Sequence, residues 1–136
     1  MLTIEAIAEA VKSEGGVSGE FRGEPPYELL IIGEAPGPEE AKKGRPFIGK
    51  AGQVLTAMLD EAGITSYYIT NVCKHFPGYD LKTRKIKKPK KEEKERWKPL
   101  LDAEFQAIQP TKVLLLGEHA FKPFFNFFGG DRKSVV

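Results

Sequence analysis

Residues 27–59 constrain the fold of this chain more than any other stretch. They open with four consecutive large aliphatic residues, Leu29 to Ile32, and turn at Gly33. A short, continuous apolar run is typical of a strand that is buried on both faces. After a loop rich in glycine and proline, apolar residues recur at helical spacing between Ala51 and Ala62. A strand, a loop and a helix in this order predict the first half of a parallel α/β unit.

The remainder of the chain alternates between helical and strand-like patterns. Strands are expected at residues 27–33, 67–70 and 113–116, and helices at 3–13, about 50–62, about 90–109 and 118–125. Two stretches without a sustained period, 13–26 and 72–89, predict surface loops, the second of them too polar for a core. Strands that alternate with long helices predict one α/β domain over residues 1–136, a three-layer sandwich with a central, mainly parallel sheet flanked by helices.

Composition narrows the class of protein. With 40% hydrophobic and 29% charged residues in 136, the chain resembles a soluble globular domain. No apolar run approaches the roughly 20 residues of a membrane span, and the N-terminus lacks the pattern of a signal peptide. We therefore expect no membrane partner and a cytoplasmic, nucleoid-associated protein. The single cysteine, Cys73, excludes an internal disulfide framework and a four-cysteine metal site within one chain.

Positive charge is concentrated in residues 82–98, which hold ten Lys and Arg residues against three Glu residues. Clustered cations on one face are what phosphate contacts require, so this stretch predicts DNA binding. The residues assigned to it are Lys82, Arg84, Lys85, Lys87 and Lys88. The alternative is a solvated loop and helix start, in which Glu92, Glu93 and Glu95 partly neutralise the later cations at helical spacing. Both interpretations stay open.

Three side chains in separate loops suggest a binding site. Glu34 follows the first predicted strand, Phe47 places an aromatic ring in a polar loop, and Asn71 ends the next strand. Ligands of open α/β sheets bind beyond the carboxyl ends of the strands, where these residues are expected. A carboxylate, a ring and an amide that converge there could hold a flat heterocycle. The alternative is an ordinary strand-to-helix connection in which Glu34 caps the helix or faces solvent.

Five ordered blocks carry a resemblance to a known family. They read GEAPG, GRPFIGKAG, YITNVCKH, RWKPLL and LLLGEHA, and the similarity extends over about residues 27–124. In this order and at these separations they resemble the uracil-DNA glycosylases, specifically the iron–sulfur-bearing group often called family four. The resemblance implies a base-excision repair enzyme that flips deoxyuridine out of DNA and hydrolyses the bond between base and sugar. Its partners would be uracil-containing DNA and other replication or repair proteins.

The resemblance also implies residue roles. Glu34 matches the acidic residue that orients water and stabilises the cationic transition state, and Phe47 matches the ring that stacks on uracil. Asn71 matches the amide that recognises the base edge. The backbone of Ala35, Pro36 and Gly37 would line the same pocket.

The chain departs from the family pattern at the iron–sulfur cluster. The family carries four cluster-ligating cysteines, but residues 11–16 contain none, Lys74-His75 stand at the third place and Trp97 at the fourth. Cys73 is displaced from a ligand position. We therefore expect no metal and no iron–sulfur cluster, with Trp97 and neighbouring apolar groups filling the space.

A second departure concerns the histidine–proline motif that ends the family pattern. The chain ends at Val136 before that motif would arrive, and proline follows neither His75 nor His119. A structural role is expected for His119, and His75 is either loop surface or part of the site. The absence of this donor leaves three functions open: a glycosylase with weakened activity, a non-catalytic DNA- or base-binding accessory module, or a nucleotide-binding protein that never meets DNA. The oligomeric state also stays open.

Overall fold

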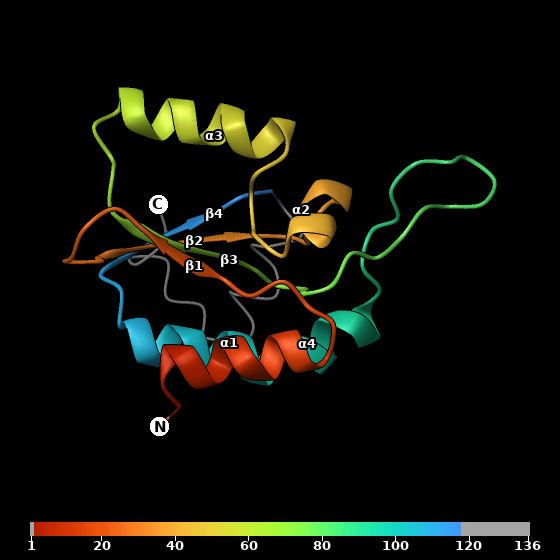
Figure 1. Ribbon diagram of the computed structural model, residues 1–136, viewed down its shortest axis with the longest axis horizontal. Coiled ribbons are helices and arrows are strands. Elements are labelled where there is room, and N and C mark those ends of the chain that lie inside the picture. The colour runs from red at the N-terminus through yellow and green to blue at the C-terminus, as the bar shows by residue number, and fades with distance from the viewer. Residues whose placement is uncertain (1, 118–136) are drawn as a thin grey trace.

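The computed structural model describes residues 2–117, and within them the chain forms four helices and four strands (Figure 1). In chain order these are α1 (Ile4–Ser13), β1 (Glu20–Arg22), β2 (Leu29–Gly33), α2 (Pro38–Lys43), α3 (Lys50–Glu61), β3 (Tyr67–Asn71), α4 (Lys91–Ile108) and β4 (Lys112–Leu115). The strands build one sheet in the order β1-β3-β2-β4, with β2 parallel to β3 and β4, and β1 antiparallel to β3. The predicted α/β architecture, a mainly parallel sheet flanked by helices, is confirmed.

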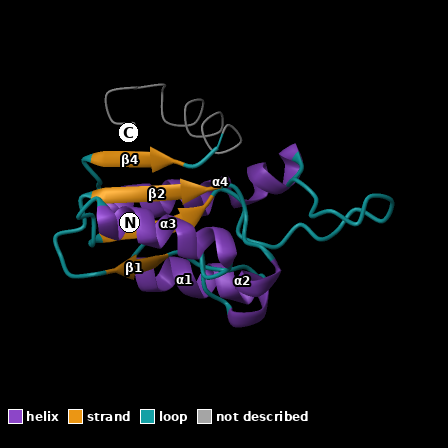
Figure 2. Cartoon of the chain, turned by 90° about the horizontal axis from the view of Figure 1, so that it is seen from above, coloured by secondary structure: helices purple, strands orange, loops and turns teal. Residues whose placement is uncertain are grey.

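Helices cover both faces of the sheet. α3 and α2 lie over one face and α1 and α4 over the other, and the view from above shows the strands side by side (Figures 1 and 2). The central strand β2 serves both layers because successive side chains of a strand point to opposite faces. Leu30 and Ile32 pack in a cluster with Leu101 of α4, whereas Ile31 packs with Leu59 of α3. The continuous apolar run of β2 follows from this two-sided burial.

The sequence-based boundaries are wrong in three places. β1 lies within residues 13–26, which were expected to be loop, and α2 lies within the loop expected before residue 50. Three residues of strand and six of helix are too short to show a period. Val72, Cys73 and Lys74 are buried, although residues 72–89 were expected on the surface. The helix expected at 118–125 lies outside the described residues.

The register of the sheet determines where a site can form. Gly33 at the end of β2 lies opposite Asn71 at the end of β3, so the loops that leave both strands begin side by side. Parallel strands present their carboxyl ends at one edge, and there the loops after β2 and β3 meet. None of the described helices is both long enough and apolar enough to span a membrane.

Candidate functional site

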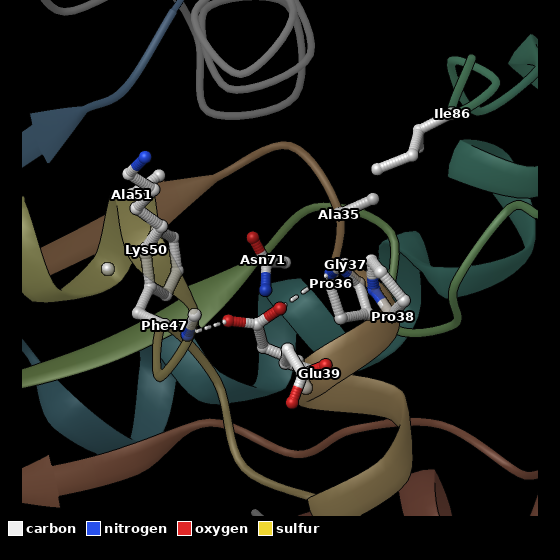
Figure 3. Close-up of a pocket in the computed structure, with 13 residues that line it drawn as sticks. Ala35, Pro36, Gly37, Pro38, Glu39, Phe47, Lys50, Ala51, Asn71 and Ile86 are labelled. Atoms are coloured by element: carbon white, nitrogen blue, oxygen red, sulfur yellow. Dashed lines mark hydrogen bonds between the residues drawn. The ribbon is translucent and has the colours of Figure 1, made fainter.

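A cavity of about 380 Å³ opens beyond the carboxyl ends of β2 and β3 (Figure 3). This volume lies in the range of small-molecule sites, roughly 300–1,000 Å³. Five residues assigned from the sequence line it, namely Ala35, Pro36, Gly37, Phe47 and Asn71. Its other lining residues are Pro38, Glu39, Glu40, Gly49, Lys50, Ala51, Gly52 and Ile86. The three segments that were expected to converge at this sheet edge do so.

Phe47 and Asn71 meet at Gly33. A Cβ atom built on Gly33 would lie 2.3 Å from Cζ of Phe47 and 2.7 Å from Oδ1 of Asn71, both far inside van der Waals contact. Only a residue without a side chain lets the ring and the amide approach the end of β2 together. Glycine at position 33 is therefore required by the geometry of the cavity rather than by its backbone angles.

Asn71 places an unpaired polar atom at this cavity. Its side chain is 2% exposed, and Oδ1 accepts no hydrogen bond from the described residues. A buried acceptor without a partner costs about 1–3 kcal/mol, so the arrangement favours a ligand that brings a donor. The residue itself is held from behind, because Nζ of Lys74 donates to the Asn71 backbone carbonyl at 2.6 Å.

Lys74 belongs to a buried network that sequence analysis missed. Its ammonium group pairs with Glu104 of α4 and donates to Oγ1 of Thr70 at 2.6 Å, and the hydroxyl of Tyr68 donates to Glu104 at 2.6 Å. Burial lowers the pKa of Lys74, and the neighbouring Glu104 carboxylate opposes that effect. The network ties the end of β3 to α4. A lysine at the start of a predicted surface loop gave no indication of burial.

Glu40 is the second residue that sequence analysis missed. Its carboxylate accepts hydrogen bonds from the backbone amides of Gly37 at 3.1 Å, Ile48 at 2.9 Å and Gly49 at 2.7 Å. Burial raises its pKa, but these amides outweigh burial and hold the pKa below the ordinary value. One side chain thus joins the turn after β2 to the loop that carries Phe47. An acid in the first turn of a short helix was the available clue.

The Phe47 loop is tightly constrained. Phe47 adopts a left-handed backbone conformation with φ of 54°, which is uncommon for a residue with a bulky side chain. α3 packs directly against it, because a Cβ atom on Gly52 would lie 2.2 Å from both the carbonyl carbon and oxygen of Phe47. The ring position is therefore set by the backbone around it.

Glu34 lies beside the lining rather than within it. It directly follows β2, is half-buried, and its backbone carbonyl accepts a hydrogen bond from the Cys73 amide at 2.9 Å. Its neighbour Ala35 lines the cavity. The catalytic role assigned to Glu34 from the sequence stays a prediction.

The first part of the basic stretch, residues 82–87, lies in a hairpin over residues 78–87. Tyr79 and Ile86 pair across it, and the Asp80 carboxylate accepts the backbone amides of Lys82 and Thr83 at its turn. The hairpin extends away from the sheet as the long green loop of Figure 1. Its exposed cations include Lys82, Arg84, Lys85 and Lys87, with Lys88 just beyond. Ile86 reaches the cavity lining, so the hairpin and the cavity are contiguous.

Comparison with known proteins identifies the family of this chain. The family model described as "Uracil DNA glycosylase superfamily" matches residues 21–135. The chain belongs to the uracil DNA glycosylase superfamily. Within this superfamily it is similar to three proteins named "Type-4 uracil-DNA glycosylase". The identity is 37% over 117 residues in Sulfurisphaera tokodaii, 39% over 103 in Archaeoglobus fulgidus and 38% over 110 in Thermotoga maritima.

These alignments include most of the chain and only part of each relative. They cover 84%, 74% and 79% of this chain, and 50%, 49% and 52% of the respective relatives. The chain therefore spans about half the length of the curated relatives that it matches.

The parts of the chain that the resemblance assigns to cluster cysteines, residues 11–16, Lys74-His75 and Trp97, lie close together. A Cβ atom on Gly16 would lie 2.8 Å from Cγ1 of Val11, 3.0 Å from Cη2 of Trp97 and 3.1 Å from Cβ of Lys74. Trp97 is fully buried there, in a cluster with Val11 and Cys73. An indole and aliphatic side chains thus fill the space between the expected ligand positions.

The residues present do not fit an iron–sulfur cluster, which is held by cysteine thiolates. Cys73 is the chain's one cysteine, and burial raises its pKa to about 11, so the thiol is protonated at neutral pH. Cys73, His75 and Glu93 do place three potential metal ligands within 4.8 Å of one another. However, Nδ1 of His75 accepts from the Trp97 indole at 2.7 Å, and Nε2 pairs with Glu93. His75 is therefore packed against α4 rather than exposed on a loop.

Proposed function

We propose that this protein hydrolyses the N-glycosidic bond of deoxyuridine in DNA, as a uracil-DNA glycosylase of base-excision repair. The observation that carries the proposal is the meeting of Phe47 and the unpaired Oδ1 of Asn71 at Gly33, inside a cavity of about 380 Å³. An aromatic plate beside a single buried acceptor suits a planar base with one edge donor. Membership of the superfamily supports the same reaction.

Asn71 supplies the discrimination between bases. Uracil carries a hydrogen on N3 that can be donated to Oδ1, whereas N3 of cytosine is itself an acceptor. Bound cytosine would leave two acceptors facing each other in a buried site, and such a mismatch costs far more than a missing methylene group. The Lys74 bond to the Asn71 backbone supports this role because it fixes the residue that carries the amide.

The chemical step assigns Glu34 to the attacking water. The water oxygen forms a bond to C1′ of the sugar as the bond to N1 of uracil breaks, and the bonding electron pair leaves with the uracil anion. The proton that the attacking water loses is balanced by protonation of this anion, so the products are free uracil and an abasic sugar. The sugar is cationic in the transition state, so a nearby carboxylate stabilises it while orienting the water. The position of Glu34 directly after β2 and next to the lining residue Ala35 supports this assignment.

The hairpin is the proposed DNA contact. Lys82, Arg84, Lys85, Lys87 and Lys88 would neutralise phosphates, while Ile86 brings the hairpin to the cavity mouth. Extrusion of the base costs a few kcal/mol of stacking, which phosphate contacts help to offset. The proposed enzyme works without an iron–sulfur cluster; the fit of Trp97 among Val11, Gly16 and Lys74 supports this part of the proposal.

The test is excision from a uracil-containing oligonucleotide, detected by alkaline cleavage at abasic sites, with a cytosine-containing oligonucleotide as control. We expect cleavage of the uracil substrate alone. Asn71→Ala should abolish it with an unchanged melting temperature, and Phe47→Ala should lower it strongly while leaving a measurable rate. If either oligonucleotide is bound in a gel shift but no product forms, the protein is a non-catalytic binding module rather than an enzyme. If the protein neither binds nor cleaves either oligonucleotide, both proposed functions fail and only the description of the fold remains.

A further inference from the structure

Arg22 of β1 contacts the loop that carries Phe47. Nη2 donates to the backbone carbonyl of Pro46 at 2.5 Å and to that of Phe47 at 3.5 Å, and Nη1 donates to Oγ1 of Thr56 in α3 at 3.5 Å. The side chain is 16% exposed, so these bonds form largely away from water. One guanidinium group therefore links the edge strand, the loop and the following helix.

The loop borders a second hollow where Arg22 reaches it. A recess of about 510 Å³ lies on this side, lined by Arg22, Arg45, Phe47, Ile48, Gln53, Thr56, Ala57 and Asp60. The left-handed conformation of Phe47 is intrinsically unfavourable and persists only where the surroundings impose it. Glu40 holds the amides of Ile48 and Gly49 on the cavity side. Arg22 holds the preceding carbonyls on the opposite side.

Glu20 aligns the guanidinium group. Its carboxylate accepts from Nε of Arg22 at 2.9 Å and from Nε and Nη2 of Arg45 at 3.1 and 2.9 Å. Burial raises the pKa of Glu20, but Arg45 and Arg22 outweigh burial and keep the pKa below its ordinary value. Glu20 is thus an anion shared by two cations, of which Arg22 contacts the loop carbonyls and Arg45, with a side chain 60% exposed, pairs with Glu20.

We propose that Arg22 is a positioning residue for base stacking, which holds the Phe47 backbone in its left-handed conformation and so fixes the ring against the cavity. The inference rests on the proposed function, because it assumes that Phe47 stacks on the base. Arg22 has no contact with the base itself and acts through Phe47. A lysine at this position cannot donate to two carbonyls, Thr56 and Glu20 with one planar group.

The contacts of Arg22 with the Pro46 and Phe47 carbonyls, here called the clamp, are tested by amide hydrogen exchange, which does not depend on activity. In Arg22→Gln, exchange at Ile48 and Gly49 should become about tenfold faster relative to Ile31 and Ile69 in the core strands, since a lost charged hydrogen bond is worth roughly that factor. Arg45→Gln is the matched control: it removes a cation from Glu20 and leaves the Arg22 contacts in place. Equal acceleration in both variants, or none in Arg22→Gln, would overturn the clamp.

The catalytic consequence is tested by a double-mutant cycle on uracil excision. Arg22→Gln should lower kcat/KM about tenfold in the parent protein and less than about twofold in a Phe47→Ala background, because the two residues act as one unit. Arg22→Lys should restore little of the loss. A full tenfold loss in the Phe47→Ala background would contradict positioning through the ring. If Phe47→Ala itself leaves excision unchanged, stacking and this consequence both fail, whereas the exchange rates still decide the clamp.

Discussion

Two loops leave the same edge of the sheet and are built in opposite ways. The loop after β2, residues 34–49, is held by the buried carboxylate of Glu40 within it and by Arg22 of β1, which lies outside it. The hairpin after β3, residues 78–87, is held by bonds between its own two arms, such as Asp80 to Lys85 and Lys87 to Gly78. Its side chains face solvent, and Leu81 is 97% exposed.

The difference matches two separate tasks. Recognition of a base edge requires atoms that are fixed to within a fraction of an ångström, and a misplacement of about 1 Å can cost 100-fold in rate. Contacts to phosphate are electrostatic and tolerate a range of geometries. The first loop should therefore be sensitive to small steric changes, and the hairpin should respond to charge and to little else.

Gly33→Ala is the strongest test of the rigid loop. The new Cβ atom would occupy space within 2.3 Å of Phe47 and 2.7 Å of Asn71, so ring and amide must move apart. We expect uracil excision to fall at least about 100-fold, with a loss of stability of about 1–3 kcal/mol from overpacking. Steady-state kinetics and urea unfolding measure the two effects.

Gly15→Ala is the control for that substitution. Gly15 has φ of 78° and no atom within 4 Å of a built Cβ, so alanine there costs about 1 kcal/mol through backbone strain alone. Excision by Gly15→Ala should be unchanged. Equal activity loss in the two variants would mean that destabilisation, rather than the approach of Phe47 and Asn71, governs activity.

The same contrast explains what could be predicted from the sequence. Phe47 and Asn71 were found because they stand in or beside elements with clear periodicity, and parallel strands bring their carboxyl ends to one edge. Glu40 and Arg22 escaped notice because each bonds to backbone atoms across a loop, from a six-residue helix and a three-residue strand that are too short to show a period.

Lys74 escaped notice for a different reason. Composition places lysine on the surface, and its burial depends on a pairing with Glu104, which is thirty residues away. The hairpin was recognised as a basic stretch, but its protrusion and its contact with the cavity through Ile86 are tertiary facts. Local patterns therefore predicted residues that line the cavity, and not the groups that hold them.

Glu40→Gln should have the next largest effect. The neutral amide is a weaker acceptor for the three backbone N–H groups, and we expect unfolding free energy to fall by about 2 kcal/mol at pH 7. The folded-state pKa of Glu40 lies below the ordinary value of 4.5, so its carboxylate stabilises the fold above that pH. The difference between parent and variant should therefore shrink as the pH falls below about 4.5 and through the folded-state pKa.

Glu39→Gln is the matched control for Glu40→Gln. Glu39 is the preceding acid of the same helix and is exposed. Urea unfolding at a series of pH values should show little change for Glu39→Gln. A pH-independent difference for Glu40→Gln would show that the carboxylate charge contributes nothing to holding the two loops.

The smallest effect is expected for the hairpin, where Lys85→Gln combined with Lys87→Gln should leave stability unchanged and lower excision only through weaker DNA binding. Each lost phosphate contact reduces the slope of log K against log salt by about 0.9 for duplex DNA, so DNA affinity should become less dependent on salt. The control pair, Lys12→Gln with Lys112→Gln, removes the same charge from α1 and β4. If both pairs lower the slope equally, net charge rather than the hairpin attracts DNA. The two loops would then differ in structure, but the hairpin would have no separate role in binding phosphate.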